Sequence, residues 1–137
     1  MRVSVLMTCH NRREQTLACL SAVAASRLAP SCSLKVYLVD DGSTDGTSLA
    51  VRERFGDVQL IPASGDLYWN RGMHLAFRTA MLDRCDAYLW LNDDTILYRD
   101  GISRLIATWQ SQAGAESCIV VGSTCAPSSG QRLPMQS

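Results

Sequence analysis

The feature that most constrains the fold is a short apolar run, residues 87–91, which leads directly into Asn92, Asp93 and Asp94. An apolar run of this length, bounded by turn-forming residues, is typical of a strand buried in a parallel sheet. The two aspartates then lie at the carboxyl end of that strand, where open α/β sheets bind ligands. Two adjacent carboxylates suit a hard divalent cation that also holds phosphate oxygens. The alternative is that they only begin a turn into the next helix.

Short apolar runs alternate with amphipathic segments along the whole chain. Strands are predicted at residues 3–8, 34–39, 58–61, 87–91 and 117–122. A helix is predicted after each of the first four, with apolar residues recurring at helical spacing. Such alternation predicts parallel strands joined by right-handed crossovers. The expected fold class is therefore α/β, a doubly wound, mostly parallel, Rossmann-like sheet of about five strands and four helices.

The first two helices carry capping signals at their starts. Asn11 precedes the first helix and Glu14 follows it by three positions, which predicts a capping box. That helix is expected to continue past Leu28 and to end at 29–31. Thr44 or Asp45 is expected to cap the second helix. The third helix has an apolar stripe made of Trp69, Met73, Ala76, Phe77, Ala80 and Met81.

Composition excludes several classes of protein. The chain has 137 residues, of which 47% are apolar and 19% charged, and its 13 basic residues balance 13 acidic ones, so no nucleic-acid partner is expected. Six cysteines without a C-x-x-C pair are expected to be reduced core thiols of a cytosolic protein. The longest apolar stretch, 17–25, is too short to cross a membrane, and the polar run 10–15 argues against a signal peptide. We therefore expect a cytoplasmic location, or one at the inner face of the membrane.

Acidic residues follow three of the predicted strands. Asp40 and Asp41 follow the second strand, Asp66 follows the third, and Asp93 and Asp94 follow the fourth. Because parallel strands end at one edge of a sheet, these carboxylates should converge. They would repel one another unless a cation or hydrogen-bond donors joined them. The pattern predicts a ligand or metal site at that edge.

The ligand is not one of the common nucleotide arrangements. The chain has no Walker A sequence, and Lys35, its only lysine, lies at the wrong end of a strand to serve as one. No G-x-G-x-x-G follows the first strand, so a dinucleotide bound in the Rossmann manner is not expected. The absence of a lysine after the fifth predicted strand also argues against a receiver-type phosphoacceptor. A nucleotide held by carboxylates and a metal ion remains.

Three segments together resemble the inverting family-two glycosyltransferases of the GT-A fold. They are residues 8–12 (Thr-Cys-His-Asn-Arg), 39–47 (Val-Asp-Asp-Gly-Ser-Thr-Asp-Gly-Thr) and 91–95 (Leu-Asn-Asp-Asp-Thr), and the resemblance covers residues 2–123. Residues 66–73 (Asp-Leu-Tyr-Trp-Asn-Arg-Gly-Met) further resemble a branch that includes rhamnosyltransferase-like enzymes. The resemblance implies transfer of a sugar, with inversion, from a nucleotide diphosphate-sugar to an acceptor hydroxyl. The acceptor would be a glycan or a lipid-linked saccharide, as in cell-wall or polysaccharide biosynthesis, and the cofactor Mn²⁺ or Mg²⁺.

The same resemblance implies roles for individual residues. Asp94 would bind the metal ion directly, and Asp93 would hold the ribose or a metal-bound water. Asp41 would accept a hydrogen bond from the base, and Asn92 stands where the family's Asp-x-Asp motif has its first aspartate. The implied nucleotide-binding residues are Thr8, Asn11, Asp40, Asp41, Asp66, Arg71 and Asp93, and the implied metal ligands are Asp94 and Asp93.

The catalytic base is not identified. The family's base is an acidic residue in the acceptor-binding half, and no acidic residue follows Glu116 here. His74 and Trp69 are more readily explained as a solvated helix-face histidine and a packing aromatic than as a base and a sugar platform. The sequence thus predicts a nucleotide-sugar-binding domain at 1–122 and a loop or tail at 123–137 that begins a missing acceptor-binding part.

Three functions remain open. The first is the donor half of a glycosyltransferase that is inactive on its own, and the second is a nucleotide-binding module that works with a partner chain. The third is a metal-dependent phosphatase with Asp93 or Asp94 as the nucleophile. The apolar residues Ile119, Val120 and Val121 also predict a homodimer that forms through the edge of the fifth strand or through the tail.

Overall fold

The computed structural model describes residues 1–112 and 118–123. The chain divides into two compact units, Met1–Ser103 and Arg104–Ser137, and the strands found among the described residues all lie in the first. The elements are, in order, β1 (Arg2–Cys9), α1 (Arg13–Ala24), β2 (Ser33–Asp41), α2 (Thr47–Arg54), β3 (Gln59–Ala63), α3 (Tyr68–Ala80), β4 (Ala87–Trp90) and α4 (Gly101–Ser111). No helix in the described part of the chain has the length and apolarity needed to cross a membrane.

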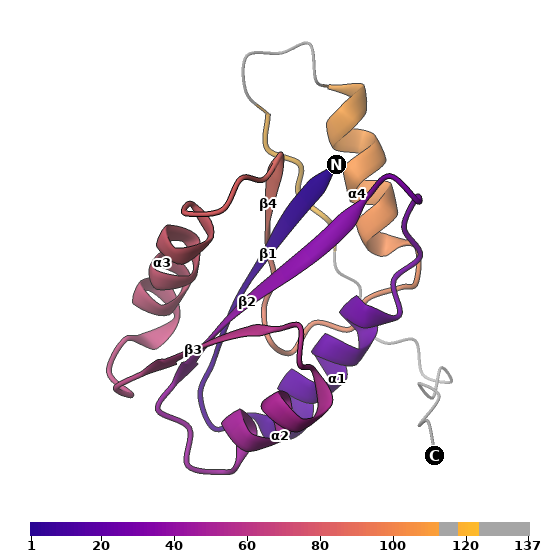
Figure 1. Cartoon of the computed structure of the whole chain (residues 1–137). Helices are drawn as coiled ribbons and strands as arrows, with labels where there is room; N and C mark the ends of the chain where they lie inside the picture. The colour runs from indigo at the N-terminus through magenta and orange to yellow at the C-terminus, as the bar shows by residue number, and fades with distance from the viewer. Residues whose placement is uncertain (113–117, 124–137) are drawn as a thin grey trace. The chain divides into compact units, whose positions relative to one another are not determined.

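The strands form one parallel sheet with the order β3-β2-β1-β4. The α/β prediction is confirmed, with α3 on one face of the sheet and α1 and α2 on the other (Figure 1). The central strand β1 is buried from Val3 to Cys9, as expected for a parallel strand covered on both faces. Edge strand β4 instead alternates, and its Tyr88 and Trp90 are exposed. Pro62 is accommodated because β3 is the other edge.

The predicted fifth strand is wrong for the residues that can be assessed. Residues 118–123 do not form a strand, and Ser117 lies outside the described residues. A strand needs a partner for its backbone groups, and apolar composition alone does not supply one. The proposed dimer contact at this strand therefore loses its structural basis. The tail from residue 124 onward lies outside the described residues, so the predicted boundary at residue 123 stays a prediction.

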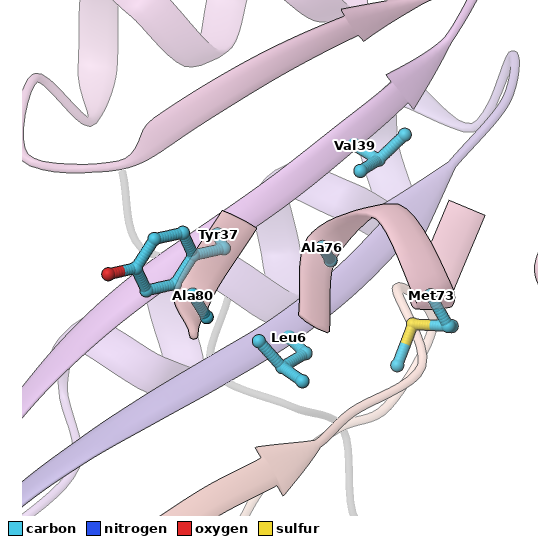
Figure 2. Packing of buried hydrophobic residues seen from close by; sticks show 6 residues of the cluster. All are labelled: Leu6, Tyr37, Val39, Met73, Ala76 and Ala80. Carbon is cyan, nitrogen blue, oxygen red and sulfur yellow. The ribbon is translucent and has the colours of Figure 1, made fainter. Parts of the chain in front are cut away.

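Helix α3 supplies half of the buried cluster on its face of the sheet, and strands β1 and β2 supply the other half. Figure 2 shows the cluster, which comprises Leu6, Tyr37, Val39, Met73, Ala76 and Ala80. The two alanines allow the helix backbone to approach the strands closely. The predicted stripe is correct in its centre and wrong at its ends, because Trp69 is 52% and Met81 59% exposed.

Both predicted helix caps are wrong in detail. Helix α1 has Arg12 as its N-cap residue, with no side-chain capping bond, and it ends at Ala24, before Leu28. Helix α2 has Gly46 as its N-cap residue, with a left-handed φ of 84°. The predicted capping residue Asp45 nevertheless accepts a hydrogen bond from the Thr47 backbone N–H (3.1 Å), and its hydrogen bonds with Thr47 and Arg13 lower the pKa of its carboxyl. The capping box failed because the Asn11 side chain binds Thr44 of another loop, whereas Asp45 still binds the first residue of α2 from one position before the N-cap.

Burial separates the cysteines into two groups. The described cysteines are all free thiols; Cys9 and Cys19 are buried, and Cys32, Cys85 and Cys118 are half-buried. Burial raises the pKa of Cys9 and of Cys19 to about 12. These two thiols are therefore inert core residues, as predicted, whereas the half-buried three do not fit that prediction.

Candidate functional site

The candidate site lies at the carboxyl edge of the sheet, where the loops that follow the strands meet. Hydrogen bonds join the loop after β1 to those after β2 and β4, and the loop after β2 to the one after β3. Because all four strands are parallel, every one of these loops leaves the sheet at the same edge. The predicted convergence of acidic residues is confirmed for the loops after β2, β3 and β4.

Asp40 organises the loop between β2 and α2. It is 3% exposed; its Oδ1 accepts the Ser43 backbone N–H (3.0 Å), and its Oδ2 accepts the Ser48 hydroxyl. Both carboxylate oxygens therefore serve the turn that follows the strand. The contacts of Asp40 are therefore with its own loop, whereas the resemblance implies a nucleotide-binding role, which stays a prediction.

Asp41 holds a second loop, the one between β3 and α3. Its Oδ1 accepts the Gly65 backbone N–H (2.8 Å), and its Oδ2 accepts those of Leu67 (2.9 Å) and Tyr68 (3.0 Å). A carboxylate has about four acceptor positions, so three are engaged by this loop. Asp41 is thus first of all the anchor of the loop that begins α3, a role that the sequence analysis missed.

Two glycines let these loops touch. Gly42 has a φ of +68°, and a Cβ built on it would lie 2.8 Å from the Gly65 Cα. Gly65 itself has a φ of +99°. Only glycine tolerates both the left-handed backbone and this close contact, so residues 42 and 65 hold the second and third loops together.

Asn11 links the loop after β1 to the loop after β2. It has a positive φ of 51°, and its backbone N–H donates to Ser43 Oγ (2.9 Å). Its Oδ1 accepts the Thr44 backbone N–H (2.7 Å). The neighbouring His10 ring contacts the Asp41 carbonyl oxygen. Asn11 is therefore bound to the next loop rather than to α1, and its predicted nucleotide-binding role stays a prediction.

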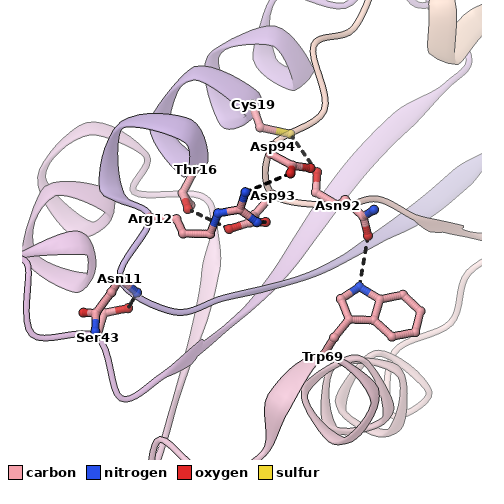
Figure 3. A network of polar contacts seen from close by, with 9 residues as sticks. All are labelled: Asn11, Arg12, Thr16, Cys19, Ser43, Trp69, Asn92, Asp93 and Asp94. Carbon is pink, nitrogen blue, oxygen red and sulfur yellow. Dashed lines mark hydrogen bonds and ion pairs between the residues drawn. The ribbon is translucent and has the colours of Figure 1, made fainter. Parts of the chain in front are cut away.

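Asp93 and Asp94 share one cation, the guanidinium of Arg12. Figure 3 shows Arg12 pointing at both side chains: Nη1 lies 3.3 Å from Asp93 Oδ1, and Nη2 lies 2.9 Å from Asp94 Oδ2. Thr16 of α1 donates its hydroxyl to the other oxygen of Asp93 (3.4 Å). Asp93 is 5% exposed, and the side chain of Asp94 is 44% exposed. The pair therefore has one buried and one accessible carboxylate.

Burial is the main influence on the ionisation of Asp93 and raises its pKa above the ordinary value. The Arg12 charge acts in the opposite direction, and the nearby Asp94 charge adds to the rise. The Asp93 carboxylate therefore depends on a nearby positive charge to remain ionised.

Asn92 fixes a tryptophan beside the two aspartates. The Trp69 indole N–H donates to Asn92 Oδ1 (3.0 Å), and Cys19 Sγ donates to the Asn92 carbonyl oxygen (3.4 Å). The Trp69 ring in turn lies 6.2 Å from that of Trp90, centre to centre. Trp69 is thus neither buried in the core nor free in solvent but is held at the margin of the site (Figure 3).

Thr8, Asp66 and Arg71 lie around the start of α3. Thr8 is buried, and a Cβ on Gly72 would lie 2.9 Å from the Thr8 Cβ, so the side chain of Thr8 packs against α3. Asp66 is exposed and accepts the Ser64 hydroxyl. Arg71 is exposed and donates to the Asp66 carbonyl oxygen (3.4 Å). These contacts leave most of the Arg71 guanidinium donors available to a ligand.

His74 lies in an open cavity of about 350 Å³, lined by Asn70, Arg71, His74, Phe77 and Trp90. No carboxylate is among the lining residues, so nothing orients the imidazole as a base. This agrees with the interpretation of His74 as a solvated helix-face residue.

A divalent cation fits the donor set at Asp93 and Asp94, provided that a ligand completes it. The described residues contain no group of three or more His, Cys, Asp or Glu side chains that could hold a metal ion by themselves. Mg²⁺, however, is commonly held by one or two carboxylates together with substrate phosphates and water. The two aspartates match that pattern.

Sequence reasoning missed Arg12 and Thr16. Arg12 lies within the 8–12 segment, but its partners are 81 and 82 residues away, so no local pattern identifies them. The available signal was charge: acidic clusters that converge at one edge require a cation.

Comparison with known proteins gives one family and a consistent set of solved structures. The sequence model described as "Glycosyl transferase family 2" matches residues 4–133. No curated protein sequence matches the chain significantly. The structure of S. aureus TarS 1-349 in complex with UDP-GlcNAc has a TM-score of 0.64 and 17% identity, covering 82% of this chain and 32% of that one.

A second solved structure, the mannosyltransferase PcManGT from Pyrobaculum calidifontis in complex with GDP-Man and Mn²⁺, is similarly related. Its TM-score is 0.67 at 22% identity, covering 77% of this chain and 31% of that chain. At these identities the likeness demonstrates the fold alone. The present chain spans about a third of the length of these two solved structures, and a fifth of the longer S. aureus TarS structure.

Proposed function

Since the chain belongs to Glycosyl transferase family 2, we propose that it forms the nucleotide-sugar-binding part of an inverting, metal-dependent glycosyltransferase. The proposed reaction moves a sugar from a nucleotide diphosphate-sugar to a hydroxyl of a glycan or lipid-linked saccharide. The single observation that carries the proposal is the carboxylate pair Asp93 and Asp94 at the end of β4, beside the loops after β1 and β2. The proposed location is the cytoplasm, or the inner face of the membrane for a lipid-linked acceptor.

The proposed donor site uses the residues that gather at this edge. Asp94 is accessible enough to bind a Mn²⁺ or Mg²⁺ ion directly. The buried Asp93 would add a second negative charge beside the ion. Bound there, the cation would supply Lewis acidity that offsets negative charge on the departing diphosphate. Arg71, near the N-terminus of α3, has guanidinium donors for phosphate oxygens.

The base of the nucleotide is proposed to lie near Asp41 and Asn11. Asp41 has about one acceptor position left for a base N–H once the loop is satisfied. Thr8 is buried under α3, so its proposed contribution is to shape the floor of the pocket. Asp40 and Asp66 are proposed to hold the loops that form its walls.

Two solved relatives support this choice of ligand class. Their complexes contain UDP-GlcNAc in one case and GDP-Man with Mn²⁺ in the other. We extend to this chain only what the two ligands share, a nucleoside diphosphate bonded to a sugar.

The test is calorimetric titration of UDP- and GDP-sugars with and without Mn²⁺, comparing the parent with Asp94→Ala. We expect Mn²⁺-dependent binding by the parent and a loss of about 100-fold or more in Asp94→Ala, or about 2.7 kcal/mol. Asp93→Ala should weaken binding less, because Asp93 is buried behind Asp94. Asp57→Ala, an exposed aspartate before β3, is the control and should bind as the parent does. Undiminished Mn²⁺-dependent binding by Asp94→Ala would refute the assignment.

A further inference from the structure

Arg12 occupies the position between Asp93 and Asp94 that a cation shared by the two carboxylates would take. One guanidinium nitrogen lies 3.3 Å from Asp93 Oδ1 and the other 2.9 Å from Asp94 Oδ2. Each contact uses a separate N–H group, so one planar side chain spans both acids. An arginine stays charged at every physiological pH, so this positive charge cannot be lost by deprotonation.

The Arg12 side chain is free to move into solvent, whereas the buried Asp93 carboxylate is held in place. Its side chain is 45% exposed and lies on the residue before α1, at the end that faces the other loops. Asp93 is buried and held on its other side by the Thr16 hydroxyl. Release of Arg12 would therefore leave the buried Asp93 and the accessible Asp94 side by side without their positive partner.

We propose that Arg12 is an internal counter-ion that competes with the divalent cation and is displaced when cation and diphosphate bind together. This inference rests on the proposed function, because it takes the donor to be a nucleoside diphosphate. A dication entering alone meets a guanidinium on the same oxygens, and like charges at such distances repel. A diphosphate supplies oxygens that accept the released guanidinium in the bidentate way that arginine prefers.

Two consequences follow for affinity. Binding of the metal ion alone is weak in the parent, since it must displace Arg12 without a new partner for it. Nucleotide then raises the metal affinity, and by linkage the metal raises the nucleotide affinity by the same factor. Arg12 is thus the residue that makes cation binding depend on the diphosphate.

The experiment measures Mn²⁺ binding without nucleotide, by the paramagnetic resonance signal of free Mn²⁺, in the parent and in Arg12→Gln. Loss of the competing charge should raise the Mn²⁺ affinity by about tenfold or more. Arg13→Gln is the matched control: Arg13 is the next residue in the chain, and within the described part of the chain its side chain forms an ion pair only with the exposed Glu14, at 4.0 Å. It should leave the Mn²⁺ affinity unchanged. If Arg12 merely supported the fold, its replacement would lower the Mn²⁺ affinity. The direction of the change in affinity therefore distinguishes a competing counter-ion from a structural residue.

A second variant, Arg12→Lys, keeps the proposal testable if Arg12→Gln does not fold. Arg12→Lys keeps the charge but cannot bridge two carboxylates in the same fork, and we expect a smaller gain than in Arg12→Gln. The factor by which UDP raises the Mn²⁺ affinity should also shrink from the parent to either variant. Unchanged or weakened Mn²⁺ binding in folded Arg12→Gln and Arg12→Lys would overturn the proposal, as would absent Mn²⁺ binding in every protein.

Failure of the proposed function would give a different result. In that case nucleotide sugars would not bind the parent even with Mn²⁺ present. The comparison of parent and Arg12→Gln with the metal alone does not depend on that result and would still decide the role of Arg12.

Discussion

Replacement of Asp41 should lower both the free energy of unfolding and the affinity for nucleotide, because Asp41 holds a loop. Asp41→Asn replaces one acceptor oxygen with an amide that donates, and it would face backbone N–H groups of the loop from Gly65 to Tyr68. A buried hydrogen-bond group left without a partner costs about 1–3 kcal/mol. We expect unfolding in urea to show a loss of that size.

The same variant separates the two roles proposed for Asp41. Affinity for a whole nucleotide should fall more than affinity for pyrophosphate, because only the nucleotide carries a base. Asp57→Asn, at an exposed position, provides the reference for both measurements. Equal losses for the two ligands would assign Asp41 to the loop alone.

The raised pKa of Asp93 predicts that the stability of the fold depends on pH. Burial raises its pKa in the folded protein above the ordinary value of 3.8, so the folded state keeps the proton to higher pH than the unfolded state does. The free energy of unfolding should therefore fall as pH rises from 3.8 through the folded pKa, and recover on acidification. Asp93→Asn cannot titrate and should lack this component. Urea unfolding of both proteins across the acid range measures it, and identical pH profiles would contradict it.

At the scale of elements, the contact between β1 and the start of α3 depends on a residue without a side chain. A Cβ on Gly72 would fall against the Thr8 hydroxyl and 2.9 Å from the Thr8 Cβ. Gly72→Ala should therefore destabilise the fold by about 1–3 kcal/mol, the usual cost of overpacking.

Thermal unfolding measures this loss, with Gly56→Ala as the control. A Cβ at Gly56 meets nothing within 4 Å, so that variant should unfold like the parent. The double variant Gly72→Ala with Thr8→Ala should recover part of the loss. A Gly72→Ala protein as stable as the parent would mean that α3 and β1 are separated more widely than described.

For the whole molecule, we predict that a polypeptide of these 137 residues binds donor but does not transfer sugar at an appreciable rate. The resemblance implies that the base belongs to the acceptor-binding half, and no acidic residue follows Glu116 in the given sequence. General-base catalysis contributes about 10²–10⁴-fold, and acceptor positioning contributes more.

At most we expect slow hydrolysis of the nucleotide sugar, followed by release of nucleoside diphosphate. Inverting transfer to any acceptor by the purified polypeptide would disprove this. If the polypeptide gains transfer only when a second chain is added, the alternative of a nucleotide-binding module with a partner is favoured.

The sequence by itself determined the strands β1 to β4, their parallel direction and the edge of the sheet at which the aspartates lie. These features follow from patterns a few residues long: apolar runs, helical spacing, and Asp, Ser and Gly at turns. The buried centre of α3 was predictable for the same reason. The family could also be recognised from short segments, at 8–12, 39–47 and 91–95.

Only the tertiary structure decided which partner each polar group would choose. Asn11 binds Thr44 instead of capping α1, Trp69 binds Asn92 instead of entering the core, and Arg12 joins Asp93 and Asp94. Residues 118–123, apolar in composition, form no strand. A local pattern favours a helix or a strand, but a strand needs a neighbour to pair with, and an ion pair across 81 residues depends on where the sheet brings the loops together.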